Sequence, residues 1–331
     1  MRSLGVLLLV ALLAAAAAGW TAWRWLDAPL ALSTERVELS IEPGTSPRTV
    51  AEAWVAAGVQ ASPRWLFEWF RFSGESRRIR AGSYEIEAGI TPRGLLDKMV
   101  QGREVLVTVR FIEGWTLRQV RAALAEAPAL RNSTAAMSEA ELMTAIGAPG
   151  VAGEGRFFPD TYAYSKGVSD LTVLKRAHQA MQRHLAEAWS ARQPGLALRS
   201  PDDLLILASI VEKETGRASD RARIAGVFAN RLRIGMPLQT DPTVIYGLGE
   251  AFDGNLRRRD LETDGPFNTY TRRGLPPTPI ALPGLASLNA TARPEATDAL
   301  YFVARGDGTS AFSATLAEHN RAVNRYQRGG R

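Results

Sequence analysis

Two glutamates near the end of one predicted helix could carry out acid–base chemistry. The segment Ser-Pro-Asp-Asp that begins at Ser200 is typical of a helix start and predicts a helix over 200–215. Four aliphatic side chains form one stripe of this helix: Leu204, Leu207, Ile210 and Val211. Glu214 falls on the same stripe and is expected to point inward. Burial disfavours the charged carboxylate and raises its pKa, which would make Glu214 a general acid near neutral pH.

Glu212 lies about 160° around the helix from Glu214, so the two acids should meet different surroundings. We expect Glu212 to have a structural or solvent-exposed role and treat it as the secondary candidate. An ion pair that only stabilises the fold is the alternative role for Glu214. Three arginines could supply that ion pair: Arg217, Arg221 and Arg231.

The composition limits the classes of protein and site to consider. A chain of 331 residues allows about two domains, and 46% hydrophobic with 22% charged residues is typical of a packed protein. The absence of cysteine excludes disulfides and thiol nucleophiles, and three histidines argue against a metal site. We therefore expect no cofactor and no metal. The net charge of +6 suits an acidic polymer, but no stacking-aromatic or zinc-finger pattern indicates nucleic acid.

The first 30 residues predict a membrane anchor. Residues 3–23 are uncharged, and about 20 residues suffice to span a bilayer. A positive start and tryptophans at the far end favour a single pass through the inner membrane, with the rest of the chain in the periplasm. A cleaved signal peptide is the alternative, with the small residues 14–18 as its cleavage region.

Residues 37–103 predict a small βααβ module. Alternation of apolar and polar residues predicts strands at 37–41 and 82–87, and helices are expected over 47–57 and 63–72. This order resembles a LysM-like module, a fold that binds N-acetylated glycans. The alternative is an α+β spacer without a ligand.

The rest of the chain predicts a connector, 104–153, and a larger domain, 154–331. The predicted elements are a strand near 105–112, helices over 116–125, 170–191 and 200–215, a strand at 300–304 and a helix over 314–327. Between them lies a Gly/Pro/Thr-rich region, 234–285, that is long for a loop without a function. The fold class is therefore α+β: a transmembrane helix, the small module and a mixed α/β domain.

Several multi-residue runs closely resemble the endolytic murein transglycosylases of the YceG-like family. The matching runs are 157–162 (FFPDTY), 208–215 (ASIVEKET), 230–247 (NRLRIGMPLQTDPTVIYG), 267–270 (FNTY), 274–277 (GLPP) and 301–304 (YFVA). In such enzymes the catalytic Glu precedes Ser or Thr near a helix end. Glu214-Thr215 matches that pattern and Glu212-Lys213 does not. The resemblance implies that 154–331 is a lytic transglycosylase domain with Glu214 as its catalytic residue.

The loop region supplies side chains suited to a saccharide cleft next to the acid. These candidate substrate-binding residues are Gln239, Thr240, Asp241, Tyr246, Asn268, Thr269 and Tyr270. Each residue by itself is more often a turn or capping residue.

The resemblance implies a lyase that cuts peptidoglycan strands internally between MurNAc and GlcNAc and leaves 1,6-anhydro-MurNAc ends. It would act in cell-wall biogenesis by ending strand elongation, with peptidoglycan synthases as candidate partners. A second hypothesis is a water-using muramidase with Asp241 as the second carboxylate. A third is a noncatalytic scaffold that binds glycan and organises wall-synthesis partners.

Overall fold

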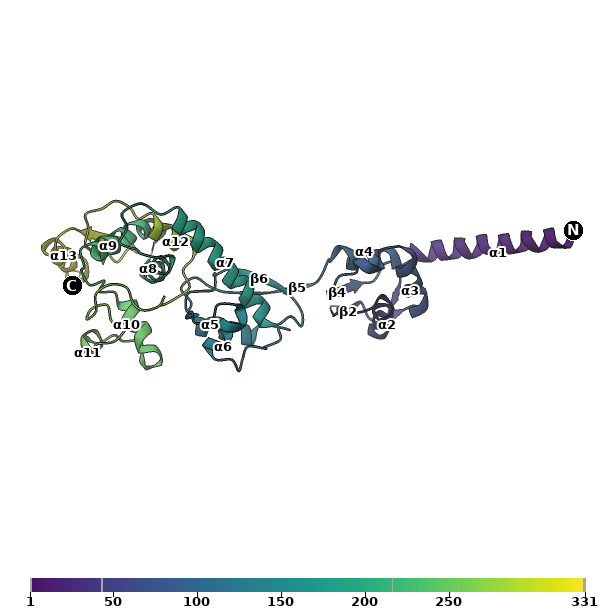
Figure 1. The fold of residues 1–331 in the computed structure, drawn as a ribbon, viewed down its shortest axis with the longest axis horizontal. Helices are drawn as coiled ribbons and strands as arrows, with labels where there is room; N and C mark the ends of the chain where they lie inside the picture. Colours follow the sequence, from purple (N-terminus) through teal and green to yellow (C-terminus); the bar gives the residue numbers. More distant parts are fainter. Residues whose placement is uncertain (1, 43, 216, 330–331) are drawn as a thin grey trace. The chain divides into compact units, whose positions relative to one another are not determined.

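The computed structural model describes residues 2–42, 44–215 and 217–329, without the side chains of 2–8, 10, 11, 18 and 328. The chain divides into two units, residues 1–107 with 163–168, and residues 108–162 with 169–331. The strands described here form two-stranded sheets among a larger number of helices (Figure 1). The predicted mixture of helices and strands is confirmed.

The first helix, α1 (Arg2–Leu26), covers the predicted membrane span. Within the described side chains, no helix is both long and apolar enough to cross a membrane. The structure therefore does not confirm the predicted transmembrane helix. The side chains of 3–8, 10, 11 and 18, which belong to the predicted span, lie outside the described residues.

The first unit contains the strand-helix-helix-strand order that the sequence predicts. Its elements are β1 (Ala31–Leu32), β2 (Arg36–Ile41), α2 (Pro47–Ala57), β3 (Val59–Gln60), α3 (Pro63–Phe72), the 3-10 turn η1 (Ser76–Arg78), β4 (Gly82–Glu87) and α4 (Pro92–Gln101). β2 and β4 pair antiparallel, from Arg36 opposite Glu87 to Ile41 opposite Gly82. Trp54, Phe70 and Tyr84 are fully buried between the helices and this sheet.

The remaining elements run from β5 to the C-terminus. They are β5 (Leu106–Arg110), α5 (Leu117–Glu126), α6 (Glu139–Ile146), β6 (Thr161–Ser165), α7 (Asp170–Ser190), α8 (Pro201–Glu214), η2 (Ala218–Asp220), α9 (Arg221–Arg233), α10 (Asp241–Leu248), η3 (Gly249–Ala251), α11 (Arg258–Glu262), α12 (Leu285–Ala292), β7 (Tyr301–Ala304), β8 (Ser310–Ser313), α13 (Leu316–Val323) and a π-helical turn, η4 (Asn324–Arg328). β5 pairs with β6, and β7 pairs antiparallel with β8.

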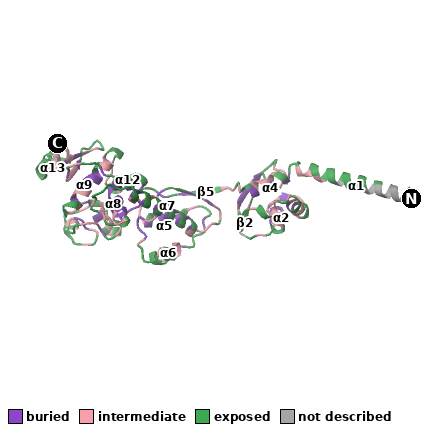
Figure 2. Cartoon of the chain, turned by 45° about the horizontal axis from the view of Figure 1, so that its top comes forward, coloured by how far each residue is buried: buried purple, intermediate pink, exposed green. Residues whose placement is uncertain are grey.

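The helix that carries both glutamates, α8, lies among α7, α9 and α12 (Figure 1). The Ser200 hydroxyl caps it by accepting a hydrogen bond from the Asp203 amide at 3.2 Å, and Pro201 fits the first helical position. Every residue from Leu204 to Val211 is buried. Figure 2 colours the chain by burial and labels α8 within this unit.

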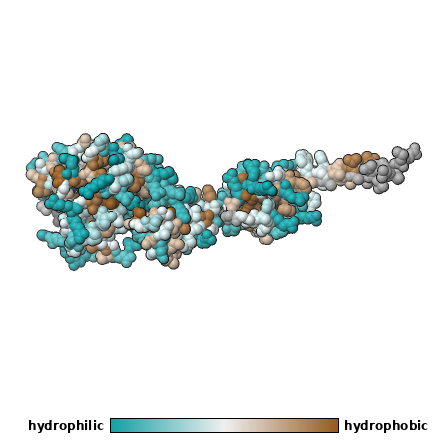
Figure 3. All heavy atoms as spheres, viewed as in Figure 1, coloured by the Kyte–Doolittle hydropathy of each residue, from teal (hydrophilic) through white to brown (hydrophobic). Residues whose placement is uncertain are grey.

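The four residues of the predicted stripe are all buried, but the buried surface of α8 extends beyond this stripe and belongs to two clusters. Leu207, Ile210 and Val211 do pack together, with residues of α9. Leu204 belongs to a different cluster, which contains Leu185 of α7 and Leu288 of α12. Because neighbouring helices cover α8 on several sides, apolar residues occupy more than one of its faces. Polar side chains gather instead on the outside of the unit, where hydrophobic ones are scattered among them (Figure 3).

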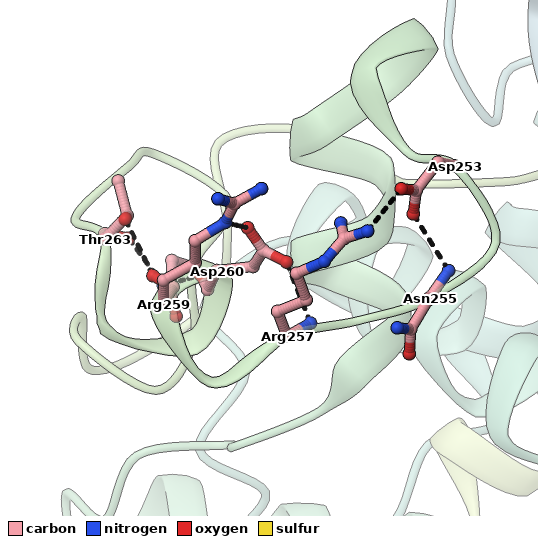
Figure 4. Close-up of polar contacts among 7 residues, drawn as sticks. Asp253, Asn255, Arg257, Arg259, Asp260 and Thr263 are labelled. Carbon is pink, nitrogen blue, oxygen red and sulfur yellow. Dashed lines mark hydrogen bonds and ion pairs between the residues drawn. The ribbon is translucent and has the colours of Figure 1, made fainter.

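The predicted long loop, 234–285, is partly helical, because it contains α10 and α11. Asn268 organises the chain after α11: its side-chain amide donates to the carbonyl oxygens of Asp260, Leu261 and Thr263 at 3.2, 3.0 and 2.7 Å. Before α11, Asp253 accepts from the Asn255 amide at 3.1 Å and pairs with Arg257 at 2.5 Å (Figure 4). Hydrogen bonds and an ion pair between nearby residues therefore stabilise the conformation of residues 253–268.

Candidate active site

Glu214 is the last residue of α8, and its carboxylate lies at the edge of a cleft. Its Oε1 accepts a hydrogen bond from the hydroxyl of Thr240, a side chain that is only 1% exposed. Burial raises the pKa of Glu214. The Thr240 hydroxyl and the charge of Arg231 lower this pKa, whereas the negative charge of Asp241 raises it, and the net direction is upward. The group thus favours the protonated state more than an ordinary glutamate does.

The three arginines proposed as ion-pair partners of Glu214 have other contacts. Arg217 donates to the Asp307 carbonyl oxygen at 2.7 Å, and Arg221 lies 3.9 Å from the Glu212 carboxylate. Arg231 is buried and donates to the carbonyl oxygens of Leu300, at 2.7 Å, and of Leu238. The positive charge of Arg231 lowers the pKa of Glu214 through space.

A cleft of about 680 Å³ opens beside Glu214, within the size range of ligand sites. One side is formed by the end of α8 and by residues around the start of α10. Further lining residues come from β7 and α13. The lining includes three predicted substrate-binding residues: Gln239, Asp241 and Tyr270.

Asp241 and Tyr270 form a pair at this cleft. The Tyr270 hydroxyl donates to Asp241 Oδ1 at 2.5 Å, while Asp241 itself remains exposed. Burial and the neighbouring carboxylates raise the pKa of Tyr270, so its hydroxyl stays protonated and acts as a donor. Gln239 has a backbone φ of 49°, a left-handed conformation that costs free energy for a non-glycine residue. Such strain is often found at functional sites.

Two further predicted residues lie behind the cleft surface. Thr269 is buried, and its Oγ1 accepts from the Thr240 amide at 3.1 Å and lies 2.9 Å from Thr243 Oγ1. Thr269 therefore holds Thr240, which in turn contacts Glu214. Asn268 is also buried, and its hydrogen bonds are those of the loop after α11. The structure gives both side chains a positioning role.

Tyr246 lies away from the Glu214 cleft. Its hydroxyl donates to Glu154 Oε2 at 3.1 Å, and its ring packs edge-on against Phe267 with centroids 4.9 Å apart. It lines a second cleft instead.

Glu212 has a structural environment. Its side chain is 8% exposed, its Oε2 accepts from the Gly284 amide at 2.9 Å, and its Oε1 lies 3.9 Å from Arg221. These contacts agree with the structural role that the sequence analysis expected for Glu212. The other expected role, a solvent-exposed side chain, was wrong. The Gly284 amide that contacts Glu212 comes from a segment 72 positions later in the sequence.

Sequence reasoning did not propose Tyr301 and His319, which also line the Glu214 cleft. Their rings stack with centroids 5.2 Å apart and an angle of 24° between their planes. Tyr301 is the first residue of the run 301–304, which resembles the family, so the sequence did contain a signal for this residue. No sequence signal pointed to His319, because this residue reaches the cleft through the packing of α13 on β7. In the described residues no cluster of His, Asp and Glu could hold a metal ion.

Comparisons with known proteins agree on one family. The family model described as YceG-like matches residues 39–325. An endolytic murein transglycosylase of Bacillus subtilis is 31% identical over 311 residues, which cover 89% of this chain and 86% of that protein. The endolytic murein transglycosylase of Streptococcus pneumoniae serotype 2 is 25% identical over 88% of this chain, which spans 58% of that longer protein. A crystal structure of a yceG-like protein from Listeria monocytogenes is 29% identical, with a TM-score of 0.55 over 87% of this chain and 99% of the other.

Proposed function

The chain belongs to the YceG-like family, and on this premise we propose that it is an endolytic murein transglycosylase. It cuts peptidoglycan glycan strands internally, between MurNAc and GlcNAc, and leaves 1,6-anhydro-MurNAc ends. The observation that carries this proposal is a partly buried carboxyl group, Glu214, held by Thr240 at the edge of a polar and aromatic cleft. By ending strands in this way the enzyme takes part in cell-wall assembly.

One carboxyl group suffices for this reaction. Glu214 protonates the glycosidic oxygen, and the bond between that oxygen and C1 of MurNAc breaks through an oxocarbenium-like transition state. The C6 hydroxyl of the same MurNAc then attacks C1, and its proton passes to the Glu214 carboxylate. Because the attacking group is already part of the substrate, the step gains from proximity and needs no water. The raised pKa of Glu214 keeps the acid protonated for the first step.

A hydrolytic muramidase is the second candidate, and one observation favours it. Asp241 is an exposed carboxylate in the same cleft as Glu214, where a second carboxylate could activate water. Its oxygen is already engaged by the Tyr270 hydroxyl. Product chemistry separates the two reactions, because hydrolysis leaves a reducing end and lytic transfer leaves an anhydro end.

Thr240→Val should shift the pH dependence of cleavage. An acid catalyst must be protonated, so the rate falls as the pH rises through the pKa of Glu214. The Thr240 hydroxyl stabilises the carboxylate and lowers that pKa, so its removal at nearly constant shape should move the alkaline limb to higher pH. The profile of kcat/KM against pH for both proteins measures this. A limb that stays in place or moves to lower pH would show that the hydroxyl does not act on the catalytic acid.

We also propose that residues 37–103 form a LysM-like glycan-binding module, followed by a connector, 104–153, and the catalytic domain, 154–331. What supports the module is the order β2, α2, α3, β4 with antiparallel pairing of the two strands. A binding module raises the local concentration of the substrate and adds no chemistry.

Deleting residues 37–103 should therefore lower cleavage of long glycan strands more than cleavage of short soluble fragments. Rates on both substrates, with thermal melts of the shortened protein to verify folding, measure the difference. Equal losses on the two substrates would favour a spacer without a ligand.

We further propose that residues 1–30 anchor the enzyme in the inner membrane, with its catalytic part in the periplasm. The support is the uncharged run 3–23. When membranes are washed with alkaline carbonate, the full chain should stay in the membrane fraction. A variant that lacks residues 2–24 should be found in the soluble fraction. Release of the full chain, or a mature protein that starts after residue 18, would contradict the anchor.

We propose peptidoglycan synthases at the same membrane as partners of the enzyme. Cross-linking in cells tests this proposal.

A further inference from the structure

A second cleft, of about 710 Å³, lies in the same unit as the catalytic one. The mechanism described above does not use it. Its walls include residues from α5 and from the end of α10, and Phe252 follows directly after α10 and η3. It is as large as the catalytic cleft and falls within the range of ligand sites.

Helix α10 connects the two clefts. Asp241, its first residue, lines the catalytic cleft, whereas Ile245 and Gly249 line the second one. Residues four positions apart lie on the same side of a helix, so Asp241 and Ile245 form a row along one face of α10, about 6 Å apart along its axis at 1.5 Å per residue. Gly249 follows as the residue that caps the end of this helix. A ligand that extends along this face from Asp241 would reach the second cleft.

The floor of the second cleft is built around Glu154, which is 6% exposed. Its Oε1 accepts from the amides of Leu117 and Gly155 at 3.0 and 3.2 Å, and its Oε2 accepts from the Tyr246 hydroxyl at 3.1 Å. These bonds hold the Tyr246 ring in the wall. Burial raises the pKa of Glu154 to about 7, so this carboxyl group is only partly ionised near neutral pH.

The charged side chains that line this cleft each have a partner within the fold. Arg118 pairs with Glu250 at 2.9 Å, and Arg121 donates to the carbonyl oxygens of Thr134 and Met137 at 3.1 and 2.7 Å. Glu139 accepts from the Gly153 amide at 2.6 Å. A cleft that combines aromatic rings with arginine side chains suits a hydroxyl-rich sugar chain that also carries carboxylates, as the lactyl groups of peptide-free MurNAc do.

We propose that the second cleft binds further sugar units of the same glycan strand whose scissile bond lies at Glu214. The proposal rests on the proposed function, because it takes the murein strand as the substrate. Tyr246 and Phe252 supply aromatic surface for the sugar rings, and the row along α10 leads the strand from one cleft to the other. An enzyme that cuts strands internally always meets such additional sugars.

Binding measurements on the full chain test this inference. The parent is the Glu214→Gln variant, which should not consume the ligand, and the probes are peptide-free murein glycan strands of a single disaccharide or of several. We expect calorimetry to show tighter binding of the longer strands. Phe252→Ala should weaken that binding about tenfold and leave the affinity for the single disaccharide as in the parent. Phe252→Leu, which keeps an apolar side chain but lacks the aromatic face, should give a smaller loss.

Ile234→Ala is the matched control, because Ile234 is an exposed apolar residue, 51% exposed, that lines neither cleft. It should bind both strands as the parent does. Equal affinity of the folded Phe252→Ala variant and the parent for long strands would overturn the inference. If the parent binds the single disaccharide and binds longer strands no more tightly, the proposed role of the second cleft is refuted and the proposed function is not. If it binds neither strand, the proposed function fails as well.

Discussion

Glu214→Gln should reduce cleavage of peptidoglycan strands by about 10²–10⁴-fold. The amide keeps the shape of the side chain and can still accept the hydrogen bond from Thr240, but it cannot deliver a proton. Because burial raises the pKa of Glu214, its carboxylate is disfavoured in the fold, and the neutral amide should not destabilise the protein. Initial rates of release of soluble fragments, with thermal melts of both proteins, measure the two effects.

Glu212→Gln is the control for this variant, because the two acids lie on the same helix two residues apart. Glu212 accepts from the Gly284 amide and lies near Arg221, so its replacement should cost stability and leave most of the activity. Losses of activity that are equal in the two variants, or larger for Glu212→Gln, with both proteins folded, would refute Glu214 as the acid.

Arg231→Leu should destabilise the protein by roughly 2–5 kcal/mol, the cost of leaving two buried carbonyl oxygens without a donor. Arg231 is only 6% exposed and donates to Leu238 and Leu300, which flank the catalytic cleft. Its charge also lowers the pKa of Glu214, so that pKa should rise further in the variant. Urea unfolding gives the change in stability.

Arg233→Leu provides the matched control, since Arg233 lies on the same helix but is exposed. It should change the free energy of unfolding by no more than about 0.5 kcal/mol. Arg231→Lys should recover only part of the loss, because an ammonium group lacks the fixed fork of the guanidinium. An Arg231→Leu protein as stable as the wild type would show that these hydrogen bonds contribute nothing to the fold.

The Ser-Pro signal at Ser200 predicted the start of α8, and the same kind of local signal precedes two other helices. Ser46, Thr91 and Ser200 each precede a proline, and each caps a helix by accepting an amide hydrogen bond. These contacts join residues three positions apart, so the sequence nearby contains all the information. The strands β2 and β4 were also predicted, since their alternation of apolar and polar residues is a local pattern.

Contacts between distant segments could not be predicted in this way. Helical periodicity gave the angle between Glu212 and Glu214, but the amide that hydrogen-bonds to Glu212 belongs to Gly284, in a remote segment. Tyr246 lies five residues after Asp241, and its hydroxyl meets Glu154, which is 92 positions earlier. His319 reaches the cleft through α13. The acid, part of the cleft and the strand that carries Tyr301 were therefore predictable from the sequence, whereas the packing of α13 that brings His319 to the cleft was not.

Mass spectrometry of the glycan ends made by the full-length enzyme tests the central claim most directly. Purified peptidoglycan is incubated with the wild type and with Glu214→Gln, and the new ends are identified by mass. The wild type should produce internal cuts that end in 1,6-anhydro-MurNAc, and Glu214→Gln should produce almost none. Reducing MurNAc ends from the wild type would show hydrolysis, and anhydro ends at the wild-type rate from Glu214→Gln would show that Glu214 is not the catalytic acid.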